Sequence, residues 1–161
     1  PGPCGTEGPF SLKSTKALAD FIDEKNIVAS ATLHTYSSLV MYPWGISTHD
    51  LETPYQDIFV KMVQDATLDS HYAYGNSTAL LYPADGTFED YAFWHSGIWS
   101  ILFELGTSHE PSNTDVQTMI AGNIPGIRRM LSNAPTTRAV DHAFHGKCDT
   151  ARMRGLDRHD E

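Results

Sequence analysis

The sequence predicts an α/β fold in which helices flank a mixed, largely parallel β-sheet. Segments with apolar residues at helical spacing alternate along the chain with apolar runs that are short enough to be strands. The chain has 161 residues, of which 40% are hydrophobic and 19% are charged. This length is enough for one domain with its own core, and these proportions are typical of a folded protein. No apolar run approaches the length of a membrane span.

Helices and strands are predicted in turn in the first half of the chain. They are, in order, a helix at 11–25, a strand at 27–33, a strand at 39–42 and a helix at 54–68. The first helix is amphipathic, with Leu18, Phe21 and Ile22 on one face and Ser11 as a candidate N-cap. The strand at 27–33 is apolar almost throughout, which is typical of a strand buried on both faces.

The second half of the chain continues the alternation. The elements are, in order, a strand at 79–82, a helix at 88–95, a strand at 98–105 and a helix at 112–131. Ser112 and Asp115 form a capping pattern at the start of the last helix, and Pro125 predicts a kink within it. We therefore expect one α/β unit over residues 1–131 and an irregular, polar C-terminal tail over 132–161.

The distribution of charge narrows the possible partners. The net charge is −9, which argues against a nucleic-acid partner, because such a partner requires a basic surface. No Lys or Arg lies between Lys61 and Arg128, whereas eight Asp and Glu residues lie there. This acidic middle suits a metal ion or a cationic ligand, and it equally suits a solvated acidic surface.

Two cysteines, Cys4 and Cys148, lie near opposite ends of the chain. Chain termini are often close in space, so the two could form a disulfide, or each could pair with a cysteine outside this chain. Two cysteines are too few for a disulfide-rich scaffold or a zinc finger. They favour, weakly, an exported protein.

Two polar residues occupy unexpected positions in the predicted strands. Glu104 lies in the apolar run SILFEL, where an ionised carboxylate needs a partner, a metal ion or water. His34 directly follows the strand at 27–33, and ligands of open α/β sheets bind at the carboxyl ends of strands. Taken alone, His34 also suits a hydrogen-bonded structural role, and Glu104 also suits a structural ion pair.

A His-x-x-Glu pair occurs at 49–52, in the sequence HDLE. Its spacing would allow both side chains to face one metal ion. Patterns of four residues arise often by chance, and this one lies among polar, turn-forming residues. A solvated loop is therefore the simpler interpretation.

Three longer motifs occur in order: LHTYSSLVMYPWG, YAYGNSTALLYPADGTFEDYAF and SILFEL. Together they resemble the zinc metallocarboxypeptidases of the carboxypeptidase A and B kind. The resemblance extends over about residues 11–131 and covers the C-terminal half of that family's catalytic domain. It implies a zinc cofactor, a hydrolytic activity and a substrate that is the C-terminus of a peptide or protein.

The resemblance also implies roles for individual residues. His34 matches the family's third zinc ligand, in an H-S-Y-S motif where Thr replaces the first Ser, and Tyr36 in this motif would line the substrate cleft. Tyr82 matches the mobile tyrosine that closes over the substrate. Glu104 matches the catalytic glutamate of the F-x-F-E-L strand. Glu89 falls at the base of the specificity pocket, where an acidic residue implies removal of C-terminal Lys or Arg; a slip of one residue would put Asp90 there instead.

The sequence departs from the family's pattern upstream of His34. The family's other two zinc ligands form an H-x-x-E pair there, together with arginines that bind the substrate carboxylate. Only 33 residues precede His34 in this chain, and they contain no His and no Arg. The HDLE pair follows His34, so it does not replace the missing ligands. The active site therefore looks incomplete within this chain alone.

Two hypotheses follow from this departure. In the first, the chain is part of a secreted, zinc-dependent metallocarboxypeptidase, and a second chain or segment, or a homo-oligomer, supplies the remaining ligands. In the second, it is a non-catalytic, peptide-binding remnant without the His-x-x-Glu half of the zinc site. We expect no nucleic-acid and no membrane partner in either case.

Overall fold

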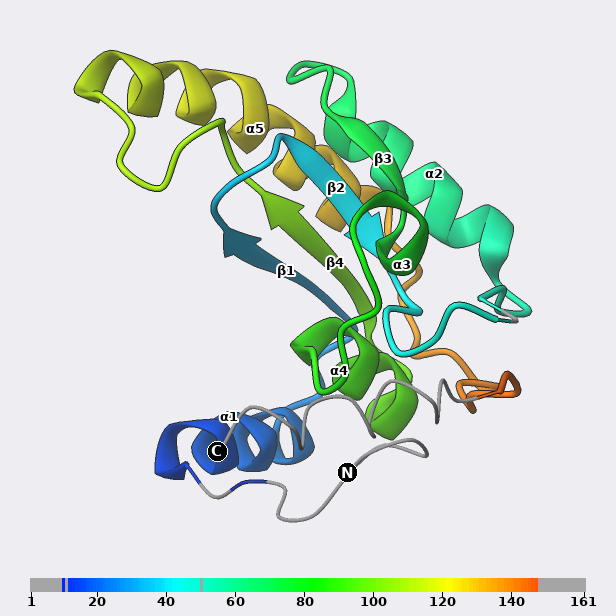
Figure 1. Ribbon diagram of the computed structural model, residues 1–161. Coiled ribbons are helices and arrows are strands. Elements are labelled where there is room, and N and C mark those ends of the chain that lie inside the picture. The colour runs from blue at the N-terminus through cyan, green and yellow to red at the C-terminus, as the bar shows by residue number, and fades with distance from the viewer. Residues whose placement is uncertain (1–9, 11, 50, 148–161) are drawn as a thin grey trace, which may run out of the picture.

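The computed structural model describes residues 10, 12–49 and 51–147 (Figure 1). Its helices and strands are, in order, α1 (Lys13–Glu24), β1 (Ala29–His34), β2 (Leu39–Tyr42), α2 (Gln56–Thr67), β3 (Ala73–Asn76), α3 (Ser77–Leu80), α4 (Phe88–Ser96), β4 (Trp99–Glu104) and α5 (Asn113–Asn133). Both cysteines and Ser11 lie outside the described residues. No helix within the described ranges is both long and apolar enough to span a membrane.

The four strands form one sheet in the order β1-β4-β2-β3. Strand β1 is parallel to β4, β2 is parallel to β3, and only the β2–β4 pair is antiparallel. This arrangement confirms the predicted mixed, largely parallel sheet with flanking helices. It also leaves β1 and β3 as the two outer strands of the sheet.

Strand β4 lies inside the sheet, and its alternating side chains build the core. Trp99, Ile101 and Phe103 project from one face, as the period of two in a strand requires, and all three are buried. They meet Phe59 of α2 and Phe93 of α4, whose ring centroids are 5.0 Å apart. Helices α2 and α5 lie side by side in Figure 1 and pack against each other. The chain between β1 and β4 thus supplies most of the residues that fix the position of β4.

The predicted strand at 79–82 is wrong. The strand in this region is β3, at Ala73–Asn76, and the following residues form the short helix α3. Asn76 explains the change of conformation, because its side chain accepts a hydrogen bond from the backbone N–H of Ala79 at 3.2 Å. This is an N-cap, and it starts a helix where the apolar run ALLY predicted a strand.

The structure confirms more of the prediction for the last helix, α5, than for the first helix, α1. In α1 only Ile22 of the three predicted core residues is buried, whereas Leu18 and Phe21 are about half exposed. In α5 the predicted capping box between Ser112 and Asp115 is present. Helix α5 continues past Pro125 to Asn133, two residues further than predicted.

The described part of the C-terminal segment, residues 134–147, contains no helix or strand but packs across the domain. The backbone N–H of Ala139 donates to the carbonyl of Gly97 at 2.8 Å, and the indole N–H of Trp99 donates to the carbonyl of Thr137. Gly97 has a φ of 65°, and a Cβ atom there would lie 2.4 Å from the carbonyl oxygen of Ala139. Glycine therefore allows both the turn after α4 and the close approach of this segment.

Candidate active site

The pairing of β1 with β4 brings His34 and Glu104 together. The two residues are partners in the register of this parallel pair, and each is the last residue of its strand. His34 Nδ1 lies 4.0 Å from Glu104 Oε1. The carboxyl ends of neighbouring parallel strands meet at one edge of the sheet, so this proximity follows directly from the topology.

Glu104 is the more buried of the two side chains. Its side chain is 13% exposed, whereas that of His34 is 60% exposed. Its Oε2 atom is buried and has no hydrogen-bond partner among the described residues. Burial raises the pKa of Glu104, and the nearby imidazoles of His34 and His109 lower it by less. A carboxylate in this setting is suited to accept a proton.

Glu89 is a second buried carboxyl, and its pKa is influenced by both members of this pair. It lies in the first turn of α4, it is 2% exposed, and its Oε1 atom has no hydrogen-bond partner among the described residues. Burial is the main cause that raises its pKa. Hydrogen bonds from its own backbone and from the Thr87 side chain lower that pKa, the charge of His34 lowers it by less, and the charge of Glu104 raises it. Glu89 is therefore within electrostatic reach of both predicted site residues.

Asp90, the alternative position for the specificity residue, has a different environment. Its two carboxylate oxygens accept hydrogen bonds from the backbone N–H of Gly45, at 3.0 and 2.9 Å. These bonds tie the start of α4 to the chain that follows β2. The Asp90 carboxylate is thus bound by the backbone, whereas Glu89 keeps one oxygen without a hydrogen-bond partner among the described residues.

The structure places the two predicted tyrosines differently. Tyr36 follows β1 directly, is 46% exposed, and packs edge-to-face on the ring of His109 with a centroid distance of 4.6 Å. Tyr82 lies between α3 and α4 and is 60% exposed. No hydrogen bond or ring contact of the described residues joins Tyr82 to His34 or Glu104. The structure thus groups Tyr36 with the pair but leaves Tyr82 apart from it.

His109 is linked to Tyr36 and Glu104, although no sequence pattern singles it out. It lies on the loop between β4 and α5, in the polar stretch GTSHEPS, where a histidine reads as an ordinary loop residue. It is linked to Glu104 because its charge lowers the pKa of that carboxyl. The one available signal was that this loop begins at the end of the strand that contains Glu104.

The described residues contain no group of three His, Cys, Asp or Glu side chains that could hold a metal ion. The HDLE pair does not change this, because His49 and Glu52 belong to no such group of three among the described residues. His34 is thus one candidate metal ligand rather than a complete site.

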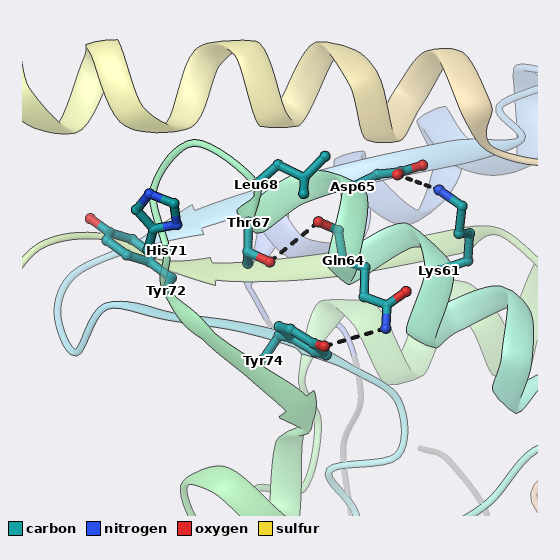
Figure 2. A pocket seen from close by; sticks show the side chains of 8 residues that line it. All are labelled: Lys61, Gln64, Asp65, Thr67, Leu68, His71, Tyr72 and Tyr74. Carbon is teal, nitrogen blue, oxygen red and sulfur yellow. Dashed lines mark hydrogen bonds and ion pairs between the residues drawn. The ribbon is translucent and has the colours of Figure 1, made fainter.

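A separate cavity of about 580 Å³ opens between α2 and β3 (Figure 2). Its lining residues are Lys61, Gln64, Asp65, Thr67, Leu68, His71, Tyr72 and Tyr74. The figure shows the ion pair of Lys61 with Asp65 and the bond of Gln64 to the Tyr74 hydroxyl on its wall. None of the predicted site residues lines this cavity.

Carboxypeptidases are similar to this chain in sequence. Carboxypeptidase B of Rattus norvegicus is 35% identical over 109 residues, which cover 63% of this chain and 26% of that protein. Carboxypeptidase O of Homo sapiens is 32% identical over 111 residues, covering 65% of this chain and 29% of that protein. The chain thus spans little more than a quarter of the length of these curated relatives.

Solved structures of carboxypeptidases share the fold. Bovine thrombin-activatable fibrinolysis inhibitor, in complex with tick carboxypeptidase inhibitor, matches with a TM-score of 0.70 and 24% identity. The match covers 80% of this chain and 47% of that one. Carboxypeptidase A from Helicoverpa armigera matches with a TM-score of 0.60 and 20% identity, over 80% of this chain and 36% of that one.

The family model described as zinc carboxypeptidase matches residues 3–123 of this chain. The match contains β1, β2, β3 and β4 and the start of α5, and it includes every residue that the sequence predicted for the site. This chain therefore belongs to the zinc carboxypeptidase family.

Proposed function

We propose that this chain supplies one zinc ligand, His34, and the catalytic glutamate, Glu104, to a metallocarboxypeptidase that releases amino acids from the C-termini of peptides and proteins. The observation that supports this most directly is the distance of 4.0 Å between His34 Nδ1 and Glu104 Oε1. The imidazole is exposed and the carboxylate is mostly buried, which suits a ligand and a base that share one substrate. Membership in the zinc carboxypeptidase family gives the reaction class.

The described residues fit a zinc ion only in part. His34 offers an exposed ring beside a carboxylate whose second oxygen has no partner among the described residues. A catalytic zinc usually takes three protein ligands, and the described residues contain no such group. His34 would therefore hold the ion together with ligands from another segment. Zinc, when bound, would polarise the peptide carbonyl and make a water molecule more acidic.

Glu104 would act as the general base and then as the general acid. It would accept a proton from the attacking water and pass it to the leaving amine. Its raised pKa, caused mainly by burial, favours this exchange, because a catalytic group works best when its pKa approaches the working pH. Because Glu104 is the last residue of β4, its backbone is fixed by the sheet, and the side chain needs little reorganisation to accept the proton.

Glu89 would select the residue to be released. One oxygen of its buried carboxylate, Oε1, has no hydrogen-bond partner among the described residues, which is costly, and a Lys or Arg side chain would satisfy this oxygen by an ion pair. Tyr36 would line the cleft, and Tyr82 would close over the substrate and exclude water. The substrate is thus a peptide or protein with a C-terminus that is preferably basic.

The proposal also covers the source of the remaining zinc ligands and the location of the protein. The remaining zinc ligands would come from a second chain or segment, or from another copy in a homo-oligomer. We place the protein outside the cell, where the substrates of an exported peptidase occur. No nucleic acid and no membrane takes part in this function.

One observation favours a second candidate, a non-catalytic protein that binds peptides. The described residues lack a three-ligand metal group, and no Arg precedes Arg128 in the sequence to bind a substrate carboxylate. Such a protein would bind peptides without holding zinc in a fixed ratio and without releasing residues. Release of a C-terminal residue that a chelator abolishes and zinc restores would exclude it.

The substitution Glu104→Gln tests the proposed role most sharply. In the complete protein that contains this chain, the variant should lower kcat by about 10²- to 10⁴-fold and leave peptide affinity nearly unchanged, because only proton transfer is lost. Glu24→Gln, which changes an exposed carboxyl at the end of α1, is the matched control and should retain full activity. Steady-state release of C-terminal lysine measures both. Full activity of Glu104→Gln would contradict the proposal.

A further inference from the structure

The C-terminal segment, residues 134–147, holds the C-terminal end of α4. The backbone N–H of Ala139 donates to the carbonyl of Gly97, the residue that follows α4, at 2.8 Å. The imidazole of His142 donates from Nδ1 to the carbonyl of Trp94, in the last turn of α4, at 2.7 Å. Two hydrogen bonds thus fix the position of this segment relative to the helix.

Phe144 of this segment packs on the buried side chain of Trp44. The two ring centroids are 5.3 Å apart with an interplanar angle of 75°, an edge-to-face contact. Trp44 is 2% exposed, and Phe144 is partly buried against the core. After Phe144, the segment is attached again, because the hydroxyl of Ser47 donates to the carbonyl of Lys147. The match to the family model ends at residue 123, so Phe144 is not part of the matched region.

Trp44 connects this contact to the start of α4. Its ring lies 5.3 Å from that of Phe93, centroid to centroid. Phe93 is four residues after Glu89, so the two side chains share one face of the helix. The residue after Trp44 is Gly45, whose N–H donates to both carboxylate oxygens of Asp90, the neighbour of Glu89. Trp44 thus contacts α4 through Phe93, and the chain that follows it is bonded to the first turn, beside Glu89.

We infer that Phe144 is a positioning residue, which acts through Trp44 to hold Glu89 where its carboxylate binds the cationic side chain of a terminal Lys or Arg. Without the Phe144 ring, Trp44 loses a packing partner, and the chain at Gly45 can shift with it. A shift at Asp90 moves the adjacent Glu89, and an ion pair at a largely buried site weakens as its charges separate. This role of Phe144 rests on the proposed role of Glu89 as the specificity residue.

Binding of two free amino acids to the complete protein that contains this chain tests the inference. The probes are L-lysine and L-norleucine, which has the same aliphatic chain without the ammonium group. Neither has a peptide bond to cleave, so NMR titration measures both dissociation constants whether or not the protein is active. The lysine preference, the ratio of the norleucine to the lysine dissociation constant, reports the ion pair with Glu89. We expect this ratio to exceed one in the unaltered protein and to approach one in Glu89→Gln.

Three substitutions in the C-terminal segment separate positioning from a general effect. Phe144→Ala should lower the lysine preference by about two- to tenfold, the range for loss of one aromatic pair, and leave norleucine affinity unchanged. Phe144→Tyr keeps the ring and should restore the preference. Val140→Ala is the matched control, because Val140 lies in the same segment and is 89% exposed. It should change neither affinity.

Hydrogen exchange of the Gly45 amide, followed by NMR in the isotope-labelled chain, tests the same connection without a ligand. Phe144→Ala should speed this exchange, because Asp90 would hold the Gly45 N–H less firmly. The amide of Leu105, which donates to the His34 carbonyl at 2.8 Å, is the internal control and should not change. If Leu105 also exchanges faster, the variant is generally unfolded, and Phe144→Leu, which keeps most of the apolar volume, takes its place in both measurements.

An unchanged lysine preference in Phe144→Ala would overturn the inference, whatever happens to Gly45 exchange. Equal weakening of lysine and norleucine, or no recovery in Phe144→Tyr, would also overturn it. The proposed function is judged separately, by Glu89→Gln and by lysine release from peptides. A preference that depends on Glu89 but not on Phe144 would leave the proposed function standing. A preference that depends on both residues, in a protein that releases no lysine, would support the inference and contradict the proposed activity. No lysine preference in the unaltered protein would contradict both.

Discussion

At the scale of single residues, Glu89 and Asp90 differ in what their buried carboxyls contact. Asp90 is 5% exposed, and its oxygens accept the N–H of Gly45. Glu89 is equally buried, but its Oε1 atom lacks a partner among the described residues, and its pKa is influenced by the charges of His34 and Glu104. Adjacent carboxyls on one helical turn thus have different surroundings: Asp90 is bound by the backbone of the chain after β2, and Glu89 keeps one unpaired oxygen among the described residues.

The pH dependence of stability should report the burial of Asp90. Burial raises its pKa from 3.8 to about 8. Between these two pH values the folded chain binds a proton that the unfolded chain has lost, so the free energy of unfolding should fall as pH rises from about 4 to about 8. Asp90→Asn should remove this contribution, which is at most about 1.4 kcal/mol per pH unit. Urea unfolding at a series of pH values measures it.

A matched substitution controls for the effect of changing any aspartate. Asp57→Asn alters an exposed carboxyl in the first turn of α2 and should leave the pH profile unchanged. An Asp90→Asn variant whose stability falls with pH as steeply as that of the unaltered chain would show that Asp90 is ionised in the folded state.

From the sequence, only the site residues at the ends of strands could be predicted. Glu104 and His34 were recognisable because a charged or polar residue at the end of an apolar run is unusual. Their proximity required the β1–β4 pairing, which the order of elements does not specify. His109 was not recognisable, because its position depends on hydrogen bonds of Gly106 with Tyr72 and Ser38, residues far away in the sequence.

At the scale of elements, α5 approaches α2 so closely that one glycine is required. A Cβ atom on Gly126 would lie 1.9 Å from the carbonyl oxygen of Ala66, closer than any real contact. Gly126→Ala should therefore destabilise the fold by about 1–3 kcal/mol or more, although alanine is the better helix former. Chemical denaturation of the variant measures the change in the free energy of unfolding.

Gly122 on the same helix provides the control for Gly126. A Cβ atom there would meet Ser70 at 3.5 Å, an ordinary contact. Gly122→Ala should be neutral or should stabilise the chain by up to about 1 kcal/mol, because glycine is unfavourable within a helix. Equal stability changes for the two variants would contradict this description of the α2–α5 interface.

Arg138 should stabilise the end of α1. Its guanidinium donates to the carbonyls of Ile22, Lys25 and Ile27, at 3.2, 3.0 and 2.8 Å. Arg138→Met removes these bonds and should speed hydrogen exchange of the last turn of α1, with a loss of stability of about 1–3 kcal/mol. Arg128→Met, at an exposed position of α5, is the control. Unchanged exchange in α1 would show that the C-terminal segment does not support this helix.

Most elements could be predicted because the spacing of their apolar residues and the residues at their ends indicate the same helix or strand. Strand β4 is a mostly apolar run, and α5 begins at a capping box, so both were predicted within two residues. Strand β3 was missed because its four residues, AYGN, include Gly and Asn, which are unfavourable in strands. The exposure of Leu18 and Phe21 could not be predicted, because periodicity finds an apolar face but not what covers it.

At the scale of the whole molecule, β1 is an outer strand of the sheet, and both β1 and α1 carry exposed apolar side chains. Leu33 of β1 is 54% exposed, and Leu18 and Phe21 of the preceding helix are also exposed. Single exposed apolar residues are common, but on a strand whose outer edge pairs with no other described strand they favour association with another segment or chain. The same edge ends at His34, so a segment that paired with β1 could bring further ligands to the site.

The zinc dependence of C-terminal lysine release by the complete protein tests the central claim most directly. We predict about one zinc ion per complete active site, release that a chelator abolishes and added zinc restores, and loss of both zinc and release in His34→Ala. His71→Ala, a histidine that lines the separate cavity, should change neither. Release that persists after chelation, or that survives in His34→Ala with zinc still bound, would contradict the account.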